Sequence, residues 1–291
     1  MAVALTSTRN RMPTTAEDLA IVHRALEEDA PDGDLTSELV VPSTFRCTAE
    51  LIAKEAGVLA GTGVARTVFA VAAEQDGTQV EQDWRLQDGA PLTPGTVIGT
   101  FSGTFRTVLR AERPAINFLA HLSGIATLTR RFVDAAAPAE VLCTRKTLPG
   151  LRSVERDAVA AGGGSLHRAS LSDAILIKDN HLRAAESVTQ AVERAKTGGL
   201  PVEVEVETMA QLEQAILAGA DRILLDNPTP DLVRKAVDRV GDPRRLEISG
   251  GVTLETVGDL VAAGARIVSV GRLTHSAPSL DISLEVTDVG D

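Results

Sequence analysis

The residues of this chain best suited to chemistry stand where short apolar runs end, after residue 140. The endings are Thr144-Arg145-Lys146-Thr147, Lys178-Asp179-Asn180-His181, Glu205 with Glu207, Asp226-Asn227, Ser249-Gly250-Gly251 and Gly271. A solvated loop charge explains any one of these endings. The same kind of ending after every run favours a shared site.

The cations among these residues indicate an acidic ligand. Arg145, Arg168 and Lys178 are accompanied in the sequence by His167 and Lys146. An arginine holds a carboxylate with its planar, two-pronged guanidinium, whereas a lysine acts as a point charge. We therefore expect this cluster to bind a small molecule that carries several carboxylates.

Glu205 and Asp226 indicate a magnesium site, because carboxylates on neighbouring strands are hard oxygen ligands. Magnesium usually keeps several waters, uses one or two carboxylates and shares a phosphorylated substrate. The last two endings offer glycine, whose backbone N–H groups can approach a phosphate closely, as in the final loops of many barrels. The residues concerned are Gly250, Gly251 and Gly271, with His275 expected to face the same phosphate. One metal-bound polyphosphate and one monophosphate are implied.

Strands alternating with helices must position these groups. The strand-like runs are 141–143, 174–177, 202–206, 222–225, 246–248 and 267–270, and the helical segments between them include 188–195, 209–218, 230–240 and 254–263. Units of roughly 20 to 35 residues are typical of an α/β barrel, whose active site lies at the carboxyl ends of its strands. For this half of the chain we therefore predict a TIM-like α/β barrel rather than an open sheet.

The run Val202–Glu207 alternates valine with glutamate, so that its three glutamates share one face of a strand. A parallel sheet is covered on both faces, and that face is therefore expected to be dry. Desolvating an ionised carboxylate costs on the order of several kcal/mol. The glutamates consequently need cations, a metal or a water-filled opening beside them.

The first part of the chain predicts a smaller α+β domain. A helix is expected over residues 14–29, capped by Thr14 or Thr15, and short antiparallel strands over 45–104. A second helix is expected to start near Pro114, whose fixed φ suits a first helical position. We predict an N-terminal domain over 1–113 and a barrel over 114–291. Whether the C-terminal tail packs back on the first domain is left open.

The composition limits the possible partners and compartments. The net charge of −11 disfavours nucleic acids and anionic membranes. The sequence has no uncharged apolar run long enough to predict a membrane helix. The apolar run at Ala2–Leu5 is too short for a signal peptide, so a cytoplasmic protein is expected. Cys47 and Cys143 form no metal or disulfide motif. A small-molecule enzyme is the class that remains.

The chain resembles the quinolinate phosphoribosyltransferase family over nearly its whole length. The matching segments are Gly33-Asp34-Leu35-Thr36-Ser37, Glu112-Arg113-Pro114-Ala115-Ile116-Asn117-Phe118-Leu119, Ser123-Gly124-Ile125-Ala126-Thr127, Thr144-Arg145-Lys146-Thr147, Gly162-Gly163-Gly164, His167-Arg168, Lys178-Asp179-Asn180-His181, Leu225-Asp226-Asn227 and Ser249-Gly250-Gly251. From the residues alone, the glycine run either turns a loop tightly or caps a helix.

The resemblance implies transfer of phosphoribose from phosphoribosyl pyrophosphate to quinolinate. Pyrophosphate and CO₂ leave, nicotinate mononucleotide forms, and Mg²⁺ takes part, as a step of de novo NAD biosynthesis. The implied fold is an open-faced α/β sandwich joined to an incomplete barrel, and the implied assembly is a homodimer or a trimer of such dimers. Arg113, which from its position alone reads as a solvated charge, is implied to enter the partner subunit's site.

The resemblance also implies roles for individual residues. Lys146, Glu205 and Asp226 are expected to be catalytic, and the two carboxylates to hold the metal. The expected substrate-binding set is Arg113, Thr144, Arg145, Lys146, His167, Arg168, Lys178, Glu205, Asp226, Ser249, Gly250, Gly251, Val270, Gly271 and His275. The sequence departs from the family pattern at Cys143, Leu166 and Ile248, which leaves fine substrate preference open.

Three alternatives compete with this interpretation. A relative found with molybdenum-uptake systems and a nicotinate phosphoribosyltransferase share the expected fold. A monocarboxylate acceptor needs fewer cations than the four of Arg113, Arg145, Arg168 and Lys178. A non-catalytic binding relative is expected to lack a metal carboxylate or Lys146, and this sequence keeps them.

Overall fold

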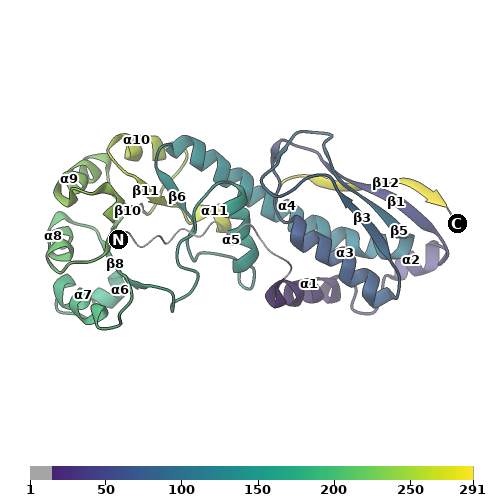
Figure 1. The fold of residues 1–291 in the computed structure, drawn as a ribbon, viewed down its shortest axis with the longest axis horizontal. Coiled ribbons are helices and arrows are strands. Elements are labelled where there is room, and N and C mark those ends of the chain that lie inside the picture. Colours follow the sequence, from purple (N-terminus) through teal and green to yellow (C-terminus); the bar gives the residue numbers. More distant parts are fainter. Residues whose placement is uncertain (1–14, 291) are drawn as a thin grey trace. The chain divides into compact units, whose positions relative to one another are not determined.

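A computed structural model describes residues 15–290 and divides the chain into two compact units (Figure 1). The parallel-sheet unit comprises residues 131–146 and 164–273, and the antiparallel-sheet unit comprises 15–130, 147–163 and 274–290. Two expectations concern residues outside this range: the N-terminal segment expected not to be a signal peptide, and the first residue of the helix expected at 14–29. No helix among residues 15–290 is long and apolar enough to cross a membrane.

The parallel-sheet unit is built on a six-stranded sheet with the order β6-β11-β10-β9-β8-β7. Its strands are β6 (Glu140–Leu142), β7 (Ile175–Ile177), β8 (Val202–Val206), β9 (Arg222–Asp226), β10 (Leu246–Ser249) and β11 (Ile267–Ser269). Every pairing in the sheet is parallel. Within the described part of the chain, β6 and β7 do not pair, so that the barrel stays open. The predicted class of an incomplete α/β barrel is confirmed.

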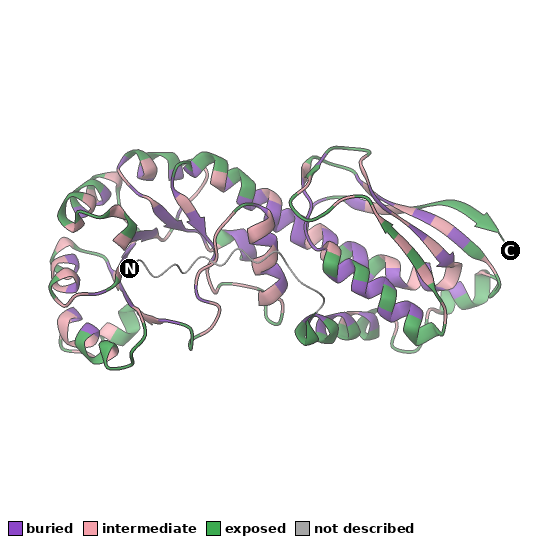
Figure 2. Cartoon of the chain, viewed as in Figure 1, coloured by how far each residue is buried: buried purple, intermediate pink, exposed green. Residues whose placement is uncertain are grey.

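Short helices connect these strands, and most lie along the outer side of the sheet (Figure 1). They are α6 (Asp179–Leu182), α7 (Val188–Lys196), α8 (Met209–Leu217), α9 (Pro230–Val240), η1 (Pro243–Arg245), α10 (Val257–Ala262) and α11 (Arg272–His275), the last of which crosses into the other unit. Capping residues set their starts: Thr208 forms a capping box with Gln211, and Thr229 precedes a proline at the first turn of α9. Helices α7, α8, α9 and α10 bury one side and expose the other (Figure 2).

The antiparallel-sheet unit contains a four-stranded sheet with the order β12-β1-β5-β3 and a two-stranded β2-β4 pair. Its strands are β1 (Arg46–Ala53), β2 (Gly57–Val58), β3 (Val80–Trp84), β4 (Pro91–Leu92), β5 (Val97–Thr104) and β12 (Ile282–Gly290). Its helices are α1 (Ala16–Asp29), α2 (Leu35–Val40), α3 (Thr62–Asp76), α5 (Arg152–Ala161) and most of α4 (Phe105–Ala136). The α+β character expected for the first part of the chain is therefore present, with the C-terminal tail as its edge strand.

Two features of this unit differ from the prediction. Helix α3 occupies a stretch that the sequence had indicated as strands only, because its buried residues recur at helical spacing between two left-handed glycines, Gly61 and Gly77. Helix α4 begins at Phe105, so that Pro114 lies inside it. An interior proline costs about 3 kcal/mol. Burial of residues such as Leu119 and Phe132 along the same helix opposes this cost.

Helix α5 shows which alternative holds for the glycine run. Gly162 is its C-cap, and Gly163 follows with φ +90°. A Cβ atom on Gly162 would lie 2.4 Å from the Ala126 carbonyl oxygen, so glycine also lets α5 pack closely on α4. The glycines therefore cap a helix, and the loop that leads to His167 starts there. The predicted domain boundary at residue 113 stays a prediction, because the compact units are discontinuous in sequence.

Candidate active site

The carboxyl edge of the parallel sheet carries most of the predicted site residues. Thr144, Arg145 and Lys146 follow β6, and Lys178 follows β7 as the N-cap of α6. Further along the same edge lie Glu205, Asp226, Ser249, Gly250, Gly251, Val270 and Gly271. Because parallel strands end together, one edge gathers residues that are far apart in the sequence.

Two predicted residues belong to the other unit. Arg113 lies on α4, where its side chain is 59% exposed and 3.9 Å from the Glu112 carboxylate. His275 is the last residue of α11, and its Nδ1 lies 2.7 Å from the Ser276 hydroxyl. Their predicted contacts with substrate stay predictions.

Lys178, Glu205 and Asp226 form a charged group at this edge, named here the rim cluster. Lys178 Nζ donates to Glu205 Oε2 at 2.5 Å. Burial raises the pKa of Asp226, and the negative charge of Glu205 raises it further, while the Asn227 amide and Lys178 lower it. One lysine thus compensates two carboxylates incompletely. A cation at this position would relieve the remaining repulsion.

The backbone beside the rim cluster is fitted closely to these carboxylates. Gly250 has φ +85°, and a Cβ atom on it would lie 2.6 Å from Asp226 Oδ1 and 2.5 Å from Asn227 Oδ1. Asn227 has a positive φ of 48°, and its N–H donates to the Ser249 carbonyl at 2.8 Å. Only glycine fits at position 250 without displacing Asp226.

Arg145 and Arg168 provide positive charge for an acidic ligand. Arg168 is only 9% exposed, and its Nη1 donates to the Ala174 carbonyl at 3.1 Å. Burial lowers the pKa of Arg168, and the charge of Arg145 lowers it further. Arg145 Nε is buried and has no hydrogen-bond partner among residues 15–290. An anion bound here would stabilise both guanidinium groups.

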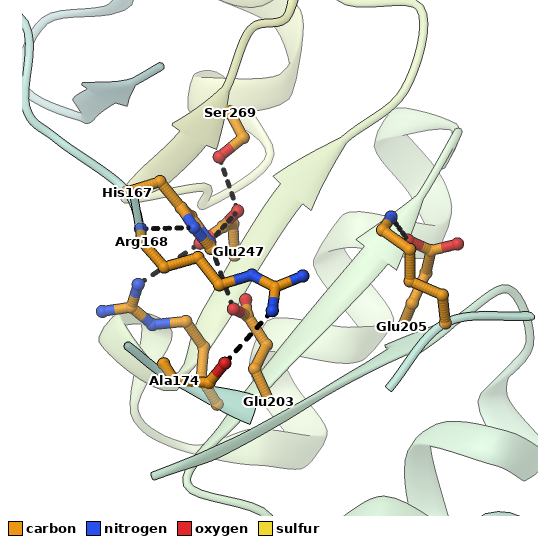
Figure 3. Close-up of polar contacts among 9 residues, drawn as sticks. His167, Arg168, Ala174, Glu203, Glu205, Glu247 and Ser269 are labelled. Carbon is orange, nitrogen blue, oxygen red and sulfur yellow. Dashed lines mark hydrogen bonds and ion pairs between the residues drawn. The ribbon is translucent and has the colours of Figure 1, made fainter. Parts of the chain in front are cut away.

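His167 lies in a second polar group inside the same unit, named here the buried cluster. Its members are His167, Glu203, Arg222, Glu247 and Ser269. His167 Nε2 lies 3.2 Å from Glu203 Oε2 and 3.5 Å from Glu247 Oε1, with Glu247 also contacted by Ser269 (Figure 3). Arg222 Nη1 lies 3.3 Å from Glu247 Oε2. Glu205 stands apart from this group in the same view.

The carboxylates of the buried cluster titrate differently. Burial raises the pKa of Glu203 to about 7, and the charge of Glu247 adds to this effect. Burial also acts to raise the pKa of Glu247, but hydrogen bonds from His167 and Ser269 and the charge of Arg222 hold it below its ordinary value. We therefore assign Glu247 as the ionised carboxylate of the pair, and Glu203 as the carboxylate that is more readily protonated.

The sequence interpretation missed most of the buried cluster. It noted that Glu203 needs compensation but gave it no role, and it passed over Arg222, Glu247 and Ser269. The available signal was a lone glutamate inside the apolar run Leu246–Ile248. Such a carboxylate in a strand buried on both faces requires a partner.

Comparisons with known proteins agree with this architecture. The protein-family model described as "Quinolinate phosphoribosyl transferase, C-terminal domain" matches residues 125–285. The family model for the N-terminal domain matches residues 34–123. A Bacillus subtilis protein named "probable nicotinate-nucleotide pyrophosphorylase [carboxylating]" is 41% identical, over 89% of this chain and 90% of its own length.

Two further relatives extend the comparison. A Nicotiana glauca protein named quinolinate phosphoribosyltransferase [decarboxylating] 1 is 39% identical, over 91% of this chain and 81% of its own length. The crystal structure of NadC from Streptococcus pyogenes superimposes with a TM-score of 0.87 at 37% identity, covering 96% of this chain and 100% of that one. Both units of the present chain are thus shared with these proteins.

Proposed function

The chain belongs to the quinolinate phosphoribosyltransferase family, and we propose that the carboxyl edge of its parallel sheet performs that family's reaction. Phosphoribose passes from phosphoribosyl pyrophosphate to the ring nitrogen of quinolinate, with loss of pyrophosphate and CO₂. The product is nicotinate mononucleotide, a precursor of NAD. The observation that carries the proposal is the meeting of cations and carboxylates at one sheet edge.

Quinolinate is a dicarboxylate, and the cations suit it. Arg145 and Arg168 lie close enough for the charge of one to lower the pKa of the other, which supports a shared anionic ligand. Lys178 supplies a further charge at the end of β7. We assign the two carboxylates of quinolinate to these three residues, which aim the ring nitrogen at the sugar.

Phosphoribosyl pyrophosphate is assigned to the remaining strand ends. Lys146 is exposed in the loop after β6 and is assigned to the pyrophosphate. Backbone N–H groups and small side chains after the other strands are assigned to the phosphates, namely Thr144, Ser249, Gly250, Gly251, Val270 and Gly271.

Glu205 and Asp226 fit a magnesium ion. Both are oxygen ligands. Burial raises the pKa of Asp226, and the charge of Glu205 raises it further, a repulsion that a divalent cation would remove. When bound, magnesium supplies positive charge to the pyrophosphate oxygens. The control experiment is removal of the metal with EDTA, which should abolish product formation and be reversed by added Mg²⁺.

The mechanism that follows is electrostatic. The bond between C1 of ribose and pyrophosphate breaks, with its electron pair leaving on pyrophosphate, and the ring nitrogen of quinolinate forms the new bond to C1. Glu205 and Asp226 stabilise the positive charge that develops on the ribose, while Lys146 stabilises the departing pyrophosphate. The C–C bond to the carboxylate beside the ring nitrogen then breaks, and CO₂ leaves while the electron pair of that bond stays on the ring carbon next to the cationic nitrogen. The resulting carbanion takes a proton from water. No side chain acts as a nucleophile.

We further propose that the enzyme is a cytoplasmic homodimer in which Arg113 reaches the site of the partner subunit. Support comes from the exposure of Arg113 and from the dicarboxylate, which an additional cation would hold. Mixing Arg113→Ala and Lys178→Ala proteins tests the arrangement, at a low quinolinate concentration where each protein alone shows little activity. Mixed dimers should regain part of the activity, because one of their two sites has both residues intact. Mixtures that stay inactive after verified subunit exchange would contradict it.

The reaction itself is tested with phosphoribosyl pyrophosphate, Mg²⁺ and either quinolinate or nicotinate. We expect CO₂ and nicotinate mononucleotide from quinolinate. Mononucleotide from nicotinate without CO₂ would indicate a nicotinate phosphoribosyltransferase, and binding without product would indicate a non-catalytic relative. Arg145→Ala and Lys178→Ala should each weaken quinolinate affinity by about 100-fold, as expected for loss of a charge-assisted contact. Near-normal affinity would refute their roles.

A further inference from the structure

The ring of His167 has both nitrogens committed to the protein. Nε2 faces Glu203 and Glu247, as described above. Nδ1 accepts the backbone N–H of Arg168 at 2.8 Å. The side chain is only 9% exposed. A histidine that binds a carboxylate needs an N–H directed at that carboxylate, and here both ring positions already serve other groups.

The hydrogen bonds also indicate which protonation state is present. Burial acts to lower the pKa of His167, while Glu203 and Glu247 raise it to about 9, which favours a doubly protonated ring. A doubly protonated ring, however, would direct an N–H at the N–H of Arg168. The bond at 2.8 Å requires a bare Nδ1. His167 is therefore assigned as neutral, with its proton on Nε2.

Arg168 is the residue on which this arrangement acts. Its backbone N–H is held by His167, and its guanidinium is held by the Ala174 carbonyl at 3.1 Å. The backbone of Arg168 and the tip of its side chain are therefore each held by a hydrogen bond before a ligand arrives. A fixed guanidinium loses less conformational freedom on binding than a mobile one.

We propose that His167 is a positioning residue which, held by Glu203 and Glu247, fixes Arg168 for the quinolinate carboxylate and does not itself bind quinolinate. The inference deepens the proposed function and rests on it for the identity of the ligand. It assigns a role to Glu203 and Glu247, which lie on β8 and β10 within the sheet.

A metal ion at the same three residues is the main alternative. One ligand atom each from His167, Glu203 and Glu247 lie within 4.8 Å of one another. Glu203 Oε1 is buried without a hydrogen-bond partner among residues 15–290. Arg222 and Ser269, however, already contact Glu247, and a cation there would face the Arg222 guanidinium. The contacts favour a hydrogen-bonded cluster over a metal centre.

A double-mutant cycle tests whether Glu247 acts through Arg168. Glu247→Gln should weaken equilibrium binding of quinolinate by about tenfold, equivalent to one lost buried hydrogen bond. In an Arg168→Ala background the same change should cost about twofold or less. Affinity for phosphoribosyl pyrophosphate serves as the internal control and should hold within about twofold. Glu213→Gln, at an exposed carboxylate, is the matched carboxylate-to-amide control. Equal losses of quinolinate affinity in both backgrounds would overturn the proposal.

Nitrogen-15 NMR of His167 tests the same idea without any ligand. The ring should show the neutral tautomer with its proton on Nε2, and Glu247→Gln should speed amide exchange at Arg168. A doubly protonated His167 ring at neutral pH would overturn the proposal. Binding of one equivalent of metal by the wild-type protein, lost in Glu247→Gln, would also overturn it. Because these signals need no substrate, they remain decisive if the chain fails to make nicotinate mononucleotide, which would count against the proposed function alone.

Two substitutions at His167 separate its two contacts. His167→Gln keeps an N–H donor near Glu203 and Glu247 but places no acceptor at the Nδ1 position, where the Arg168 N–H is bound. His167→Asn keeps the acceptor near the Nδ1 position but loses the donor. Each should raise the KM for quinolinate about tenfold with little change in kcat, because each breaks one half of the same chain of contacts. Wild-type KM values in both variants would refute the positioning role.

Discussion

Glu203 and Glu205 stand on the same face of β8 but meet opposite environments. Glu203 is 7% exposed and lies in the buried cluster beside His167 and Glu247. The Glu205 side chain is 12% exposed and pairs with Lys178, whose own side chain is 47% exposed. One step of the strand pleat thus separates a cluster enclosed by protein from one that opens to solvent.

The difference shows how the fold separates stability from reactivity. In the buried cluster, Arg222, His167 and Ser269 belong to the chain itself, so that Glu247 is compensated before any ligand binds. In the rim cluster, one lysine serves two carboxylates, and the pKa of Asp226 stays raised. We infer that substrate and metal complete the second arrangement only. Four substitutions test this contrast.

The largest expected effect is on stability, from Glu247→Ala. The change leaves Arg222 without its buried partner, and breaking a buried ion pair in this way costs about 3–5 kcal/mol. We expect a loss of that size in the free energy of unfolding, measured by urea denaturation. Glu247→Gln, which keeps the side-chain volume, provides a milder variant if the alanine protein does not fold.

Glu213→Ala is the control for this measurement. Glu213 pairs with Arg239 through two contacts, at 2.6 and 2.9 Å, but both side chains are 44% exposed. Water screens such a pair, and its loss should hardly change the denaturation curve. Similar losses from Glu247→Ala and Glu213→Ala would show that enclosure of the buried cluster has no energetic importance.

Glu205→Gln should have the opposite profile, with a large loss of activity and little loss of stability. Removing one preorganised charge that stabilises a transition state typically lowers kcat by about 10²–10³-fold. Its removal also relieves repulsion at Asp226, so the urea midpoint should stay unchanged or rise slightly. kcat at saturating concentrations of both substrates is the measurement. An active Glu205→Gln enzyme would end the distinction between the two clusters.

These contrasts explain what the sequence could and could not predict. Apolar runs and their charged endings are local signals, and they located each strand of the parallel sheet to within a few residues. The carboxyl-edge rule then gathered residues such as Lys178 and Asp226 without any knowledge of their contacts. The residues that enclose Glu203 could not be found in this way. Their partners come from strands whose side-chain register no local pattern records.

The smaller unit was harder to predict for the same reason. Strand β12 pairs with β1, more than two hundred residues earlier in the chain, and the sequence analysis left open whether the C-terminal tail packs on the first domain. Helix α4 runs through Pro114, where local propensity predicts a start, because burial along its length outweighs the cost of the proline. Tertiary contacts override local preference in both cases.

The third test uses pH. The pKa of Glu203 is raised from 4.5 to about 7 in the folded protein, so the folded state binds this proton more tightly. The stabilisation is full below the ordinary value and is lost as pH rises through about 7. Glu203→Gln mimics the protonated acid and should remove this loss. The stability of the variant relative to wild type should therefore increase with pH, by at most about 1.4 kcal/mol per pH unit.

Urea denaturation at several pH values provides the measurement for Glu203. Glu247 acts in the opposite sense, because its lowered pKa gives stability that disappears as pH falls. Because the charge of Glu247 also raises the pKa of Glu203, the difference between variant and wild type reports how the titration of this pair changes when Glu203 can no longer ionise. A difference that does not vary with pH would mean that Glu203 is ionised throughout the range.

The smallest effect is expected at Gly250, where the backbone shapes the rim cluster. A Cβ atom there would lie 2.6 Å from Asp226 Oδ1, at a φ of +85° that alanine adopts poorly. Gly250→Ala should therefore move Asp226 and raise the KM for phosphoribosyl pyrophosphate about tenfold, equivalent to about 1.4 kcal/mol. Gly258→Ala is the matched control, because nothing lies within 4 Å of its added methyl group and it sits in α10. Equal KM values in the two variants would show that Asp226 works without close support from the backbone, and the rim cluster would then be defined by charge alone.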